Sequence, residues 1–141
     1  MIKKIFKILK YWLPATLWAS VIFTFSSFPT GQASEIHWQD FILKKSAHIF
    51  IYAVLTILVF RGLRGYGVNF LDSLKYSILM ATIYGISDEF HQSFTPGRDP
   101  KVRDILFDIL GSFLGVYIIA KIIPRLPKEI LRLVERFEIT N

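Results

Sequence analysis

The stretch YWLPATLWASVIFTFSSFPTGQAS, Tyr11–Ser34, contains no Asp, Glu, Lys or Arg. As an α-helix rising ~1.5 Å per residue, it is long enough to cross a hydrocarbon core of ~30 Å. Three further apolar stretches follow at 46–60, 73–90 and 105–123, and each reaches the length of a span by taking polar residues into its ends. The sequence therefore predicts an all-α protein, a bundle of four transmembrane helices.

The composition supports membrane insertion. Of the 141 residues 52% are hydrophobic, 13 are Phe, and none is Cys. The missing cysteines exclude disulfides, thiolate nucleophiles and cysteine-ligated zinc. The net charge of +6 comes from basic residues at the ends of the apolar stretches, without an aromatic RNA-binding motif, so nucleic acid is not the expected partner.

The distribution of Lys and Arg predicts the orientation. Most of them fall in the N-terminal segment, in the loop between the second and third stretches, and in the tail after residue 123. By the positive-inside rule these parts face the cytoplasm, so the chain is expected to cross the membrane four times with both termini cytoplasmic. The polar block SDEFHQSFTPGRDPKVRD, Ser87–Asp104, then faces outward.

Two domains of unequal size are expected: a transmembrane domain at 1–123 and a cytoplasmic tail at 124–141. In the tail, apolar Ile130, Leu131, Val134 and Phe137 share one side of a predicted short amphipathic helix that lies on the inner leaflet.

Three local features of the first half of the chain have structural interpretations. Gly31–Ala33 resembles a signal-peptide cleavage site, but the preceding apolar run is longer than a usual signal sequence, which favours an uncleaved anchor. Pro14 is expected near the start of the first helix, where a proline is tolerated. His37 and Trp38 are expected in the outer loop as membrane-interface residues.

Polar residues from all four predicted helices fall at the same, outward-facing side. Lys45, His48 and Tyr52 share one helix face. Tyr84, Asp88 and His91 share another, and the stripe of Asp104 and Asp108 continues into the small residues Gly111, Ser112 and Gly115, which permit close helix packing. Charged side chains in a span are costly unless paired or hydrated, so a functional site is the first interpretation. The alternative is a set of interfacial salt bridges between Asp88, Glu89, Asp104, Asp108 and Lys44, Lys45, Arg98, Arg103.

The order and spacing of these residues resemble the VanZ-like family of small bacterial membrane proteins. Four motifs carry the resemblance over Tyr11–Gly115: Trp12 and Trp18 with Ser26-Ser27-x-Pro29; Lys45-x-x-His48-x-x-x-Tyr52; Asp88-Glu89-x-His91-Gln92-x-Phe94-x-Pro96-Gly97-Arg98; and Asp104-x-x-x-Asp108-x-x-Gly111-x-x-x-Gly115. The resemblance implies a role in the cell envelope, since the family is named after a protein associated with resistance to the glycopeptide teicoplanin. It implies no particular reaction.

The predicted ligand-binding set comprises Lys45, His48, Tyr52, Asp88, Glu89, His91, Gln92, Arg98, Arg103, Asp104 and Asp108. Within it, His48, Glu89 and Asp104 are the candidates for catalysis. Metal binding by His48 and His91 with the nearby acids is disfavoured because carboxylate-bridged metal bundles use the carboxylate–histidine pair twice and this chain has it once. We therefore predict no metal and no cofactor.

Two functions are compatible with this set. The first is binding, without turnover, of a lipid headgroup or amphiphile, which would lower sensitivity to lipophilic glycopeptides such as teicoplanin. The alternative is hydrolysis or transfer on a phosphate-bearing lipid, with Lys45, Arg98 and Arg103 holding the phosphate and His48 as nucleophile or base, oriented by Glu89 or Asp104. The expected partners are membrane lipids, an isoprenoid-linked cell-wall precursor or a lipoglycopeptide, and the Gly111-x-x-x-Gly115 spacing is compatible with a homo-oligomer.

Overall fold

The computed structural model describes residues 2–29, 36–98 and 100–136, and this part of the chain consists of helices joined by short turns and loops, without strands. Five α-helices follow one another: α1 (Ile2–Ser26), α2 (His37–Gly65), α3 (Phe70–Gln92), α4 (Val102–Tyr117) and α5 (Lys128–Arg136). Beyond Tyr117 the chain continues through a π-helical turn (Ile118–Ile122) and a 3-10 turn (Ile123–Arg125) before α5. The predicted all-α class is confirmed.

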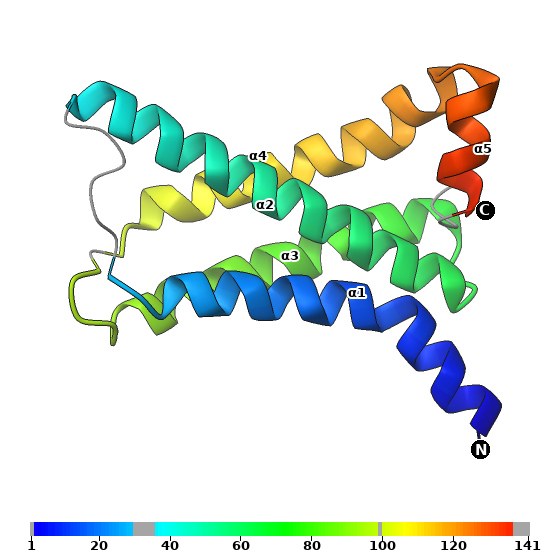
Figure 1. The fold of residues 1–141 in the computed structure, drawn as a ribbon, viewed down its shortest axis with the longest axis horizontal. Coiled ribbons are helices and arrows are strands. Elements are labelled where there is room, and N and C mark those ends of the chain that lie inside the picture. The colour runs from blue at the N-terminus through cyan, green and yellow to red at the C-terminus, as the bar shows by residue number, and fades with distance from the viewer. Residues whose placement is uncertain (1, 30–35, 99, 137–141) are drawn as a thin grey trace.

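Helix α2 is the centre of the bundle and contacts α1, α3 and α4 (Figure 1). Its buried residues Tyr52, Leu55 and Val59 form the apolar core together with Ala15 and Ile22 of α1, and with Ala81 of α3. A second apolar cluster forms toward the end of the bundle that carries both chain termini. In it, Phe60 of α2 packs against Ile119 and Ile123. Two apolar clusters therefore hold the long helices together.

Glycines set the close approach of α4 to α2. A Cβ atom on Gly111 would lie 2.4 Å from the carbonyl oxygen of Ile49, and one on Gly115 would lie 2.7 Å from that of Ala53. Real Cβ atoms essentially never come within 3.0 Å of such an atom. The predicted role of these small residues in helix packing is confirmed.

Aromatic donors attach α1 to its neighbours. The indole Nε1 of Trp18 donates to the carbonyl oxygen of Ile51 at 2.8 Å, and the hydroxyl of Tyr84 donates to that of Ala19 at 2.6 Å. These carbonyls lie inside helices and have a second lone pair available, so each bond joins two helices without breaking either.

Helix α1 differs from the prediction of a span at Tyr11–Ser34. It begins at Ile2 and ends at Ser26, because the lysines near the N-terminus join the helix while the Ser-Ser-x-Pro sequence ends it. Pro14 was predicted to lie near the start of this helix, but it lies inside the helix. A proline there removes one backbone hydrogen bond and bends the helix, and Figure 1 shows α1 bent part-way along its length.

The start of α2 also corrects the sequence prediction. His37 and Trp38 form its first turn and are not part of a loop, although Trp38 remains largely exposed. The residues proposed as a cleavage site, Gly31–Ala33, lie outside the described residues.

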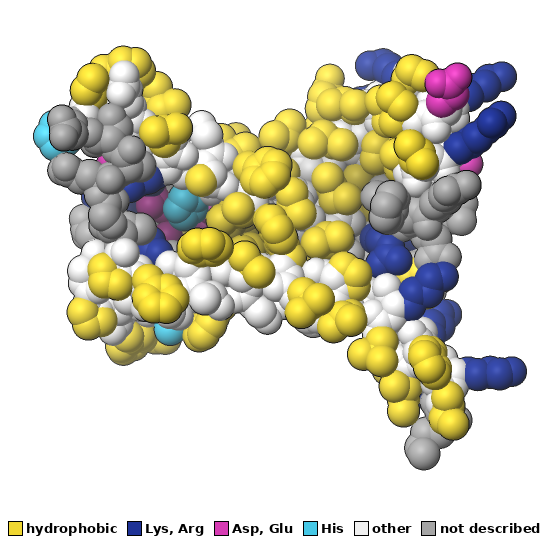
Figure 2. Space-filling model, in the orientation of Figure 1, with side chains coloured by type: hydrophobic (Ala, Val, Ile, Leu, Met, Phe, Trp, Pro, Cys, Tyr) yellow, Lys and Arg dark blue, Asp and Glu magenta, His cyan; other side chains and the backbone are white. Residues whose placement is uncertain are grey.

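Three helices are long and apolar enough to cross a membrane: Ile2–Ser26, His37–Gly65 and Val102–Arg125. Their exposed side chains include large hydrophobic residues such as Leu17, Phe50 and Leu110, which suits contact with lipid. The chain therefore has the helices of a membrane protein. Figure 2 shows hydrophobic side chains over the middle of the molecule and Lys and Arg gathered at the end where both termini lie.

The predicted amphipathic helix of the tail is present as α5. Its Leu131 and Val134 pack against the cluster of Phe60, Ile119 and Ile123, whereas Ile130 and Leu133 are exposed. Part of its apolar face is thus used against the bundle itself. Phe137, predicted to share that face, lies outside the described residues.

Candidate functional site

The polar residues of the four long helices meet at the end of the bundle opposite the termini. The last turn of α1, the first half of α2, the last turns of α3 and the first turns of α4 contribute to it. We call this group of side chains the polar end; its members are Ser26, Ser27, Lys45, His48, Tyr52, Asp88, Glu89, His91, Gln92, Arg98, Asp104 and Asp108.

The stripe on α2 faces α4. Lys45 Nζ lies 2.6 Å from Asp104 Oδ1, and His48 Nδ1 lies 2.8 Å from Asp108 Oδ1. Lys45 and His48 are three residues apart on α2, and Asp104 and Asp108 are four residues apart on α4. The two residues on each helix therefore share a face, and both contacts form along the same α2–α4 interface. The Asp108 side chain is 2% exposed, so its partnership with His48 is made away from water. The sequence analysis expected Glu89 or Asp104 to orient His48, and the structure places Asp108 there.

The stripe on α3 faces α1. Ser26 Oγ donates to Asp88 Oδ2 at 2.7 Å, and Gln92 Nε2 donates to the same oxygen at 2.8 Å. His91 Nε2 lies 3.1 Å from Ser27 Oγ, and its ring centroid lies 4.4 Å from that of Phe23. In the sequence analysis the two serines appear only as part of the first family motif. The available signal was the pair of adjacent serines at the end of α1, opposite an acid and a histidine that lie three residues apart on α3.

The loop between α3 and α4 is attached to the end of α1 by Arg98. Its Nε donates to the carbonyl oxygen of Phe28 at 2.8 Å, and its Nη2 donates to that of Phe25. Gly97 beside it has φ +78° and packs against Pro29, a conformation that favours glycine. Burial lowers the pKa of the Arg98 guanidinium while the charges of Asp88 and Glu89 oppose that shift, and the group stays charged.

Three buried oxygens of the polar end have no hydrogen-bond partner among the described residues: Tyr52 Oη, Asp88 Oδ1 and Glu89 Oε1. The Tyr52 side chain is fully buried. The other oxygen of Glu89 accepts from the backbone N–H of Lys101 at 2.9 Å. Because an unsatisfied buried polar group is costly, the two carboxylate oxygens need a donor, and the Tyr52 hydroxyl needs a donor or an acceptor, that the described protein groups do not supply.

The salt-bridge alternative holds for one of the expected cations. Lys45 pairs with Asp104, as that interpretation expects, but Lys44 pairs with Asp40 at 2.8 Å, one turn earlier on the same helix. The Arg103 guanidinium lies over the Phe41 ring at 5.0 Å, and Arg98 binds backbone carbonyls. Among the described residues, Asp88, Glu89 and Asp108 therefore form no ion pair with a Lys or Arg side chain.

No group of three or more His, Asp or Glu side chains suited to hold a metal ion occurs among residues 2–29, 36–98 and 100–136. His48 and His91 face different helices, α4 and α1, so they do not combine into one ligand set.

A comparison with protein families identifies the chain. The sequence model of the family described as VanZ/LLP1 matches residues 11–124, which is most of the protein. The chain belongs to the VanZ/LLP1 family. No curated protein and no solved structure matches it. The resemblance drawn from the four sequence motifs is thereby confirmed.

The VanZ/LLP1 match covers all of the polar end as well as α1 from Tyr11 and the whole of α2, α3 and α4. It stops at Pro124, before α5. The short C-terminal helix is thus outside the part that defines the family.

Replacement of Arg98 by lysine is expected to loosen the α3–α4 loop, because one ammonium cannot reach both carbonyls in the geometry that Nε and Nη2 use. Loss of one such bond costs about 1 kcal/mol. Limited proteolysis of the purified protein in detergent should therefore cut Arg98→Lys faster than wild type. Arg103→Lys is the matched control, since a lysine can still lie over the Phe41 ring. Equal cleavage of both variants would contradict the role of Arg98 as an attachment of the loop.

Proposed function

We propose that this VanZ/LLP1 protein crosses the bacterial plasma membrane four times, with both termini cytoplasmic. We further propose that its outward-facing polar end binds the headgroup of a membrane lipid or another amphiphile. Such binding alters the response of the cell envelope to lipophilic glycopeptides such as teicoplanin.

Helix α3 supports the fourth crossing. Its 23 residues span ~34 Å at ~1.5 Å per residue, which is enough to cross the membrane beside the three apolar helices. Its charged residues lie only near its two ends, with Asp72 and Lys75 at one and Asp88 and Glu89 at the other. The uncharged segment between them, 76–87, lies at the depth where a charge would be most costly.

The orientation is supported by the distribution of charge along the bundle. Lys and Arg collect at the end that carries both termini, whereas Asp88 and Glu89 of α3 and the acids of α4 lie at the opposite end (Figure 2). The positive-inside rule assigns the first end to the cytoplasm.

The observation that carries the binding proposal is the set of unpartnered oxygens Tyr52 Oη, Asp88 Oδ1 and Glu89 Oε1. Two of them are carboxylate oxygens, which can only accept when ionised, so the missing groups are donors. Ammonium, hydroxyl and amide groups are the donors that lipid headgroups, sugar-bearing wall precursors and glycopeptides carry. A ligand rich in donors suits the interior of the polar end better than a phosphate does.

A phosphate-bearing lipid as a substrate is the second candidate, and the pair of His48 and Asp108 favours it. Asp108 binds the Nδ1 side of the imidazole, which leaves Nε2 as the nitrogen able to take up or release a proton. That arrangement of an acid behind a histidine is common to many general bases. In this alternative His48 transfers the proton and Asp108 positions the ring.

The test is the susceptibility of bacteria that express the chain to teicoplanin and to vancomycin, wild type beside Glu89→Gln, with membrane levels of each protein measured. The variant keeps the side-chain size but loses the charge and one acceptor, which weakens a charged hydrogen bond by roughly tenfold or more. We expect wild type to protect selectively against teicoplanin and Glu89→Gln to lose that protection at equal abundance.

Asp72→Asn is the matched control, because it removes the same charge from the other end of α3, where Asp72 is exposed. If the wild-type protein gives no protection, the proposed role in the response to glycopeptides is wrong. If protection falls in proportion to membrane abundance, or if Asp72→Asn also loses it, the polar end has a structural role and does not bind the ligand.

A further inference from the structure

The start of α1 extends beyond the other long helices. We call residues 2–10 the N-terminal arm. All of them are exposed, and Figure 1 shows the arm leaning away from the bundle beyond the bend in α1. The next two residues pack on the last turn of α2: a Cβ atom on Gly65 would collide with the Tyr11 ring, and one on Gly62 would lie 3.2 Å from the Trp12 ring. The arm therefore begins level with the end of α2.

Contacts with α2 fix the base of the arm. Pro14 has no N–H, so the carbonyl oxygen of Lys10, one turn earlier, loses its partner within the helix. Arg61 Nη1 of α2 donates to that oxygen at 3.0 Å, and the Arg61 guanidinium lies 5.5 Å from the centroid of the Tyr11 ring. A bond to a neighbouring helix thus replaces the backbone bond that Pro14 removes. The arm leaves the bundle in a direction that the structure specifies.

The two sides of the arm differ in chemistry. Large apolar residues with the spacing i, i+3, i+4, i+7 and i+11 follow one side and continue past the arm, and all of them are exposed: Ile2, Ile5, Phe6, Leu9 and Leu13. The other side carries four lysines, Lys3, Lys4, Lys7 and Lys10, and Ile8 lies between the two sides. The arm contains no acid. Figure 2 shows hydrophobic side chains along one side of the arm and basic side chains along the other. Helices with this pattern lie in the membrane interface.

The lysines of the arm do not stabilise the helix. The N-terminus of a helix is the positive end of its dipole and favours acids, yet the first turn of α1 has none and contains Lys3 and Lys4. Lys3 and Lys7 are four residues apart, a spacing at which like charges repel each other. An external anionic surface would offset both effects. The charge of the arm therefore favours an anionic partner.

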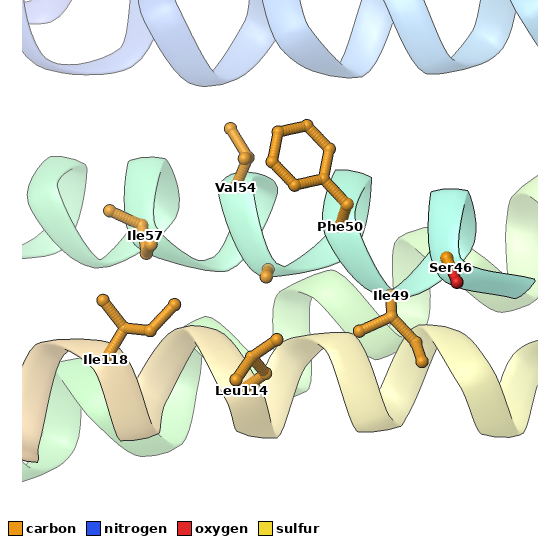
Figure 3. A pocket seen from close by; sticks show the side chains of 8 residues that line it. Ser46, Ile49, Phe50, Val54, Ile57, Leu114 and Ile118 are labelled. Atoms are coloured by element: carbon orange, nitrogen blue, oxygen red, sulfur yellow. The ribbon is translucent and has the colours of Figure 1, made fainter. Parts of the chain in front are cut away.

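The exposed surface beside the middle of the bundle has a different chemistry. A groove between α2 and the segment that contains Leu114 and Ile118 is lined by eight residues, of which Ser46 alone is polar (Figure 3). A surface without charge suits the hydrocarbon core, whereas an apolar stripe backed by lysines suits the boundary between hydrocarbon and headgroups. Of these two exposed surfaces, only that of the arm is suited to the membrane interface.

We propose that the N-terminal arm lies along the membrane surface at the end of the bundle that carries both termini, and binds anionic phospholipids there. Its apolar side enters the headgroup boundary, and its long lysine side chains reach the surrounding phosphates. A second copy of the chain would bring four more lysines to this place and no acid from its own arm. The proposal depends on insertion of the bundle into a membrane but not on ligand binding at the polar end.

The experiment uses the full chain, whose lack of cysteine allows one introduced cysteine to carry a fluorophore. Each labelled variant is reconstituted into vesicles of dioleoyl phosphatidylcholine alone and of an equal mixture with dioleoyl phosphatidylglycerol. We expect acrylamide, a quencher dissolved in the water, to reach the fluorophore of Phe6→Cys in the first vesicles and not in the second. Lys4→Cys, on the opposite side of the arm, should be quenched in both. Leu17→Cys, on the exposed surface of α1 within the bundle, should be shielded in both.

The charge of the arm is tested on the background of Phe6→Cys. Replacement of Lys3, Lys4 and Lys7 by glutamine should lower the ratio of shielded to accessible arm in the mixed vesicles about a hundredfold, since each lysine near an anionic surface contributes about fivefold. The matched control replaces Arg125, Lys128 and Arg132 by glutamine. It removes the same charge from the same end of the bundle but not from the arm, and should leave the fluorophore shielded.

Three results would overturn the proposal. The first is a Phe6→Cys fluorophore that acrylamide reaches in both kinds of vesicle. The second is shielding that is equal without phosphatidylglycerol or that rises with the ratio of protein to lipid, which would indicate neutral lipid or a second copy of the chain. The third is release of the arm by the control replacements as well. Because the polar end is unaltered in all these variants, the outcomes are independent of the antibiotic test.

Discussion

Gly111→Ala is expected to destabilise the protein although alanine is the better helix former. In an exposed helix the exchange would stabilise by roughly 0.5–1 kcal/mol. At Gly111 the added Cβ would lie 2.4 Å from the Ile49 carbonyl oxygen, so α4 and α2 must move apart to reach at least 3.0 Å. Overpacking of this kind costs about 1–3 kcal/mol. Because α2 is the centre of the bundle, we expect the loss to spread to the pairs that α4 makes at the polar end.

Thermal unfolding of the purified protein in detergent measures this effect, and the sign of the change is informative. A lower melting temperature shows that packing outweighs helix propensity. Leu110→Ala is the matched control, since Leu110 precedes Gly111 on α4 and is more than half exposed. A melting temperature at or above that of wild type for Gly111→Ala would show that the two helices can separate without cost.

The fold was predictable because its main cause, the exclusion of charge from long apolar stretches, is local in the sequence. The stripe of small residues on α4 was likewise readable, since its spacing matches one helix face. The bounds of α1, by contrast, could not be predicted from the sequence. Its N-terminal lysines extend an exposed helix that hydropathy alone cannot detect, and Pro14 does not end it.

The residues of the polar end were predictable as a group, whereas their pairing was not. Sequence spacing shows that Lys45 and His48 share a face, but it does not show which helix that face meets. The structure turns this face toward α4 and the stripe of Asp88 and His91 toward α1. The unpartnered oxygens of Tyr52 and Glu89 emerge only from this three-dimensional arrangement.

Loss of one partner of the pair between His48 and Asp108 is expected to be more harmful than loss of both. Asp108→Ala leaves His48 beside a cavity without an acceptor, and His48→Ala leaves a buried carboxylate without its partner. Removal of one partner of a hydrogen bond to a buried charged group leaves the other unsatisfied and costs about 1–3 kcal/mol, whereas apolar replacement of both partners can be nearly neutral. We therefore expect His48→Phe with Asp108→Leu to unfold at a higher temperature than Asp108→Ala.

The double-mutant cycle between His48→Ala and Asp108→Ala isolates the pair. Residues in contact couple by about 0.5–3 kcal/mol, while distant residues add within about 0.5 kcal/mol. Lys44→Ala provides the reference for an ion pair near the surface, which contributes at most about 1 kcal/mol. Additive losses in the cycle would mean that the 2.8 Å contact contributes no stability. That result would contradict a stabilising role for Asp108. It would favour the alternative in which Asp108 positions the His48 imidazole for proton transfer.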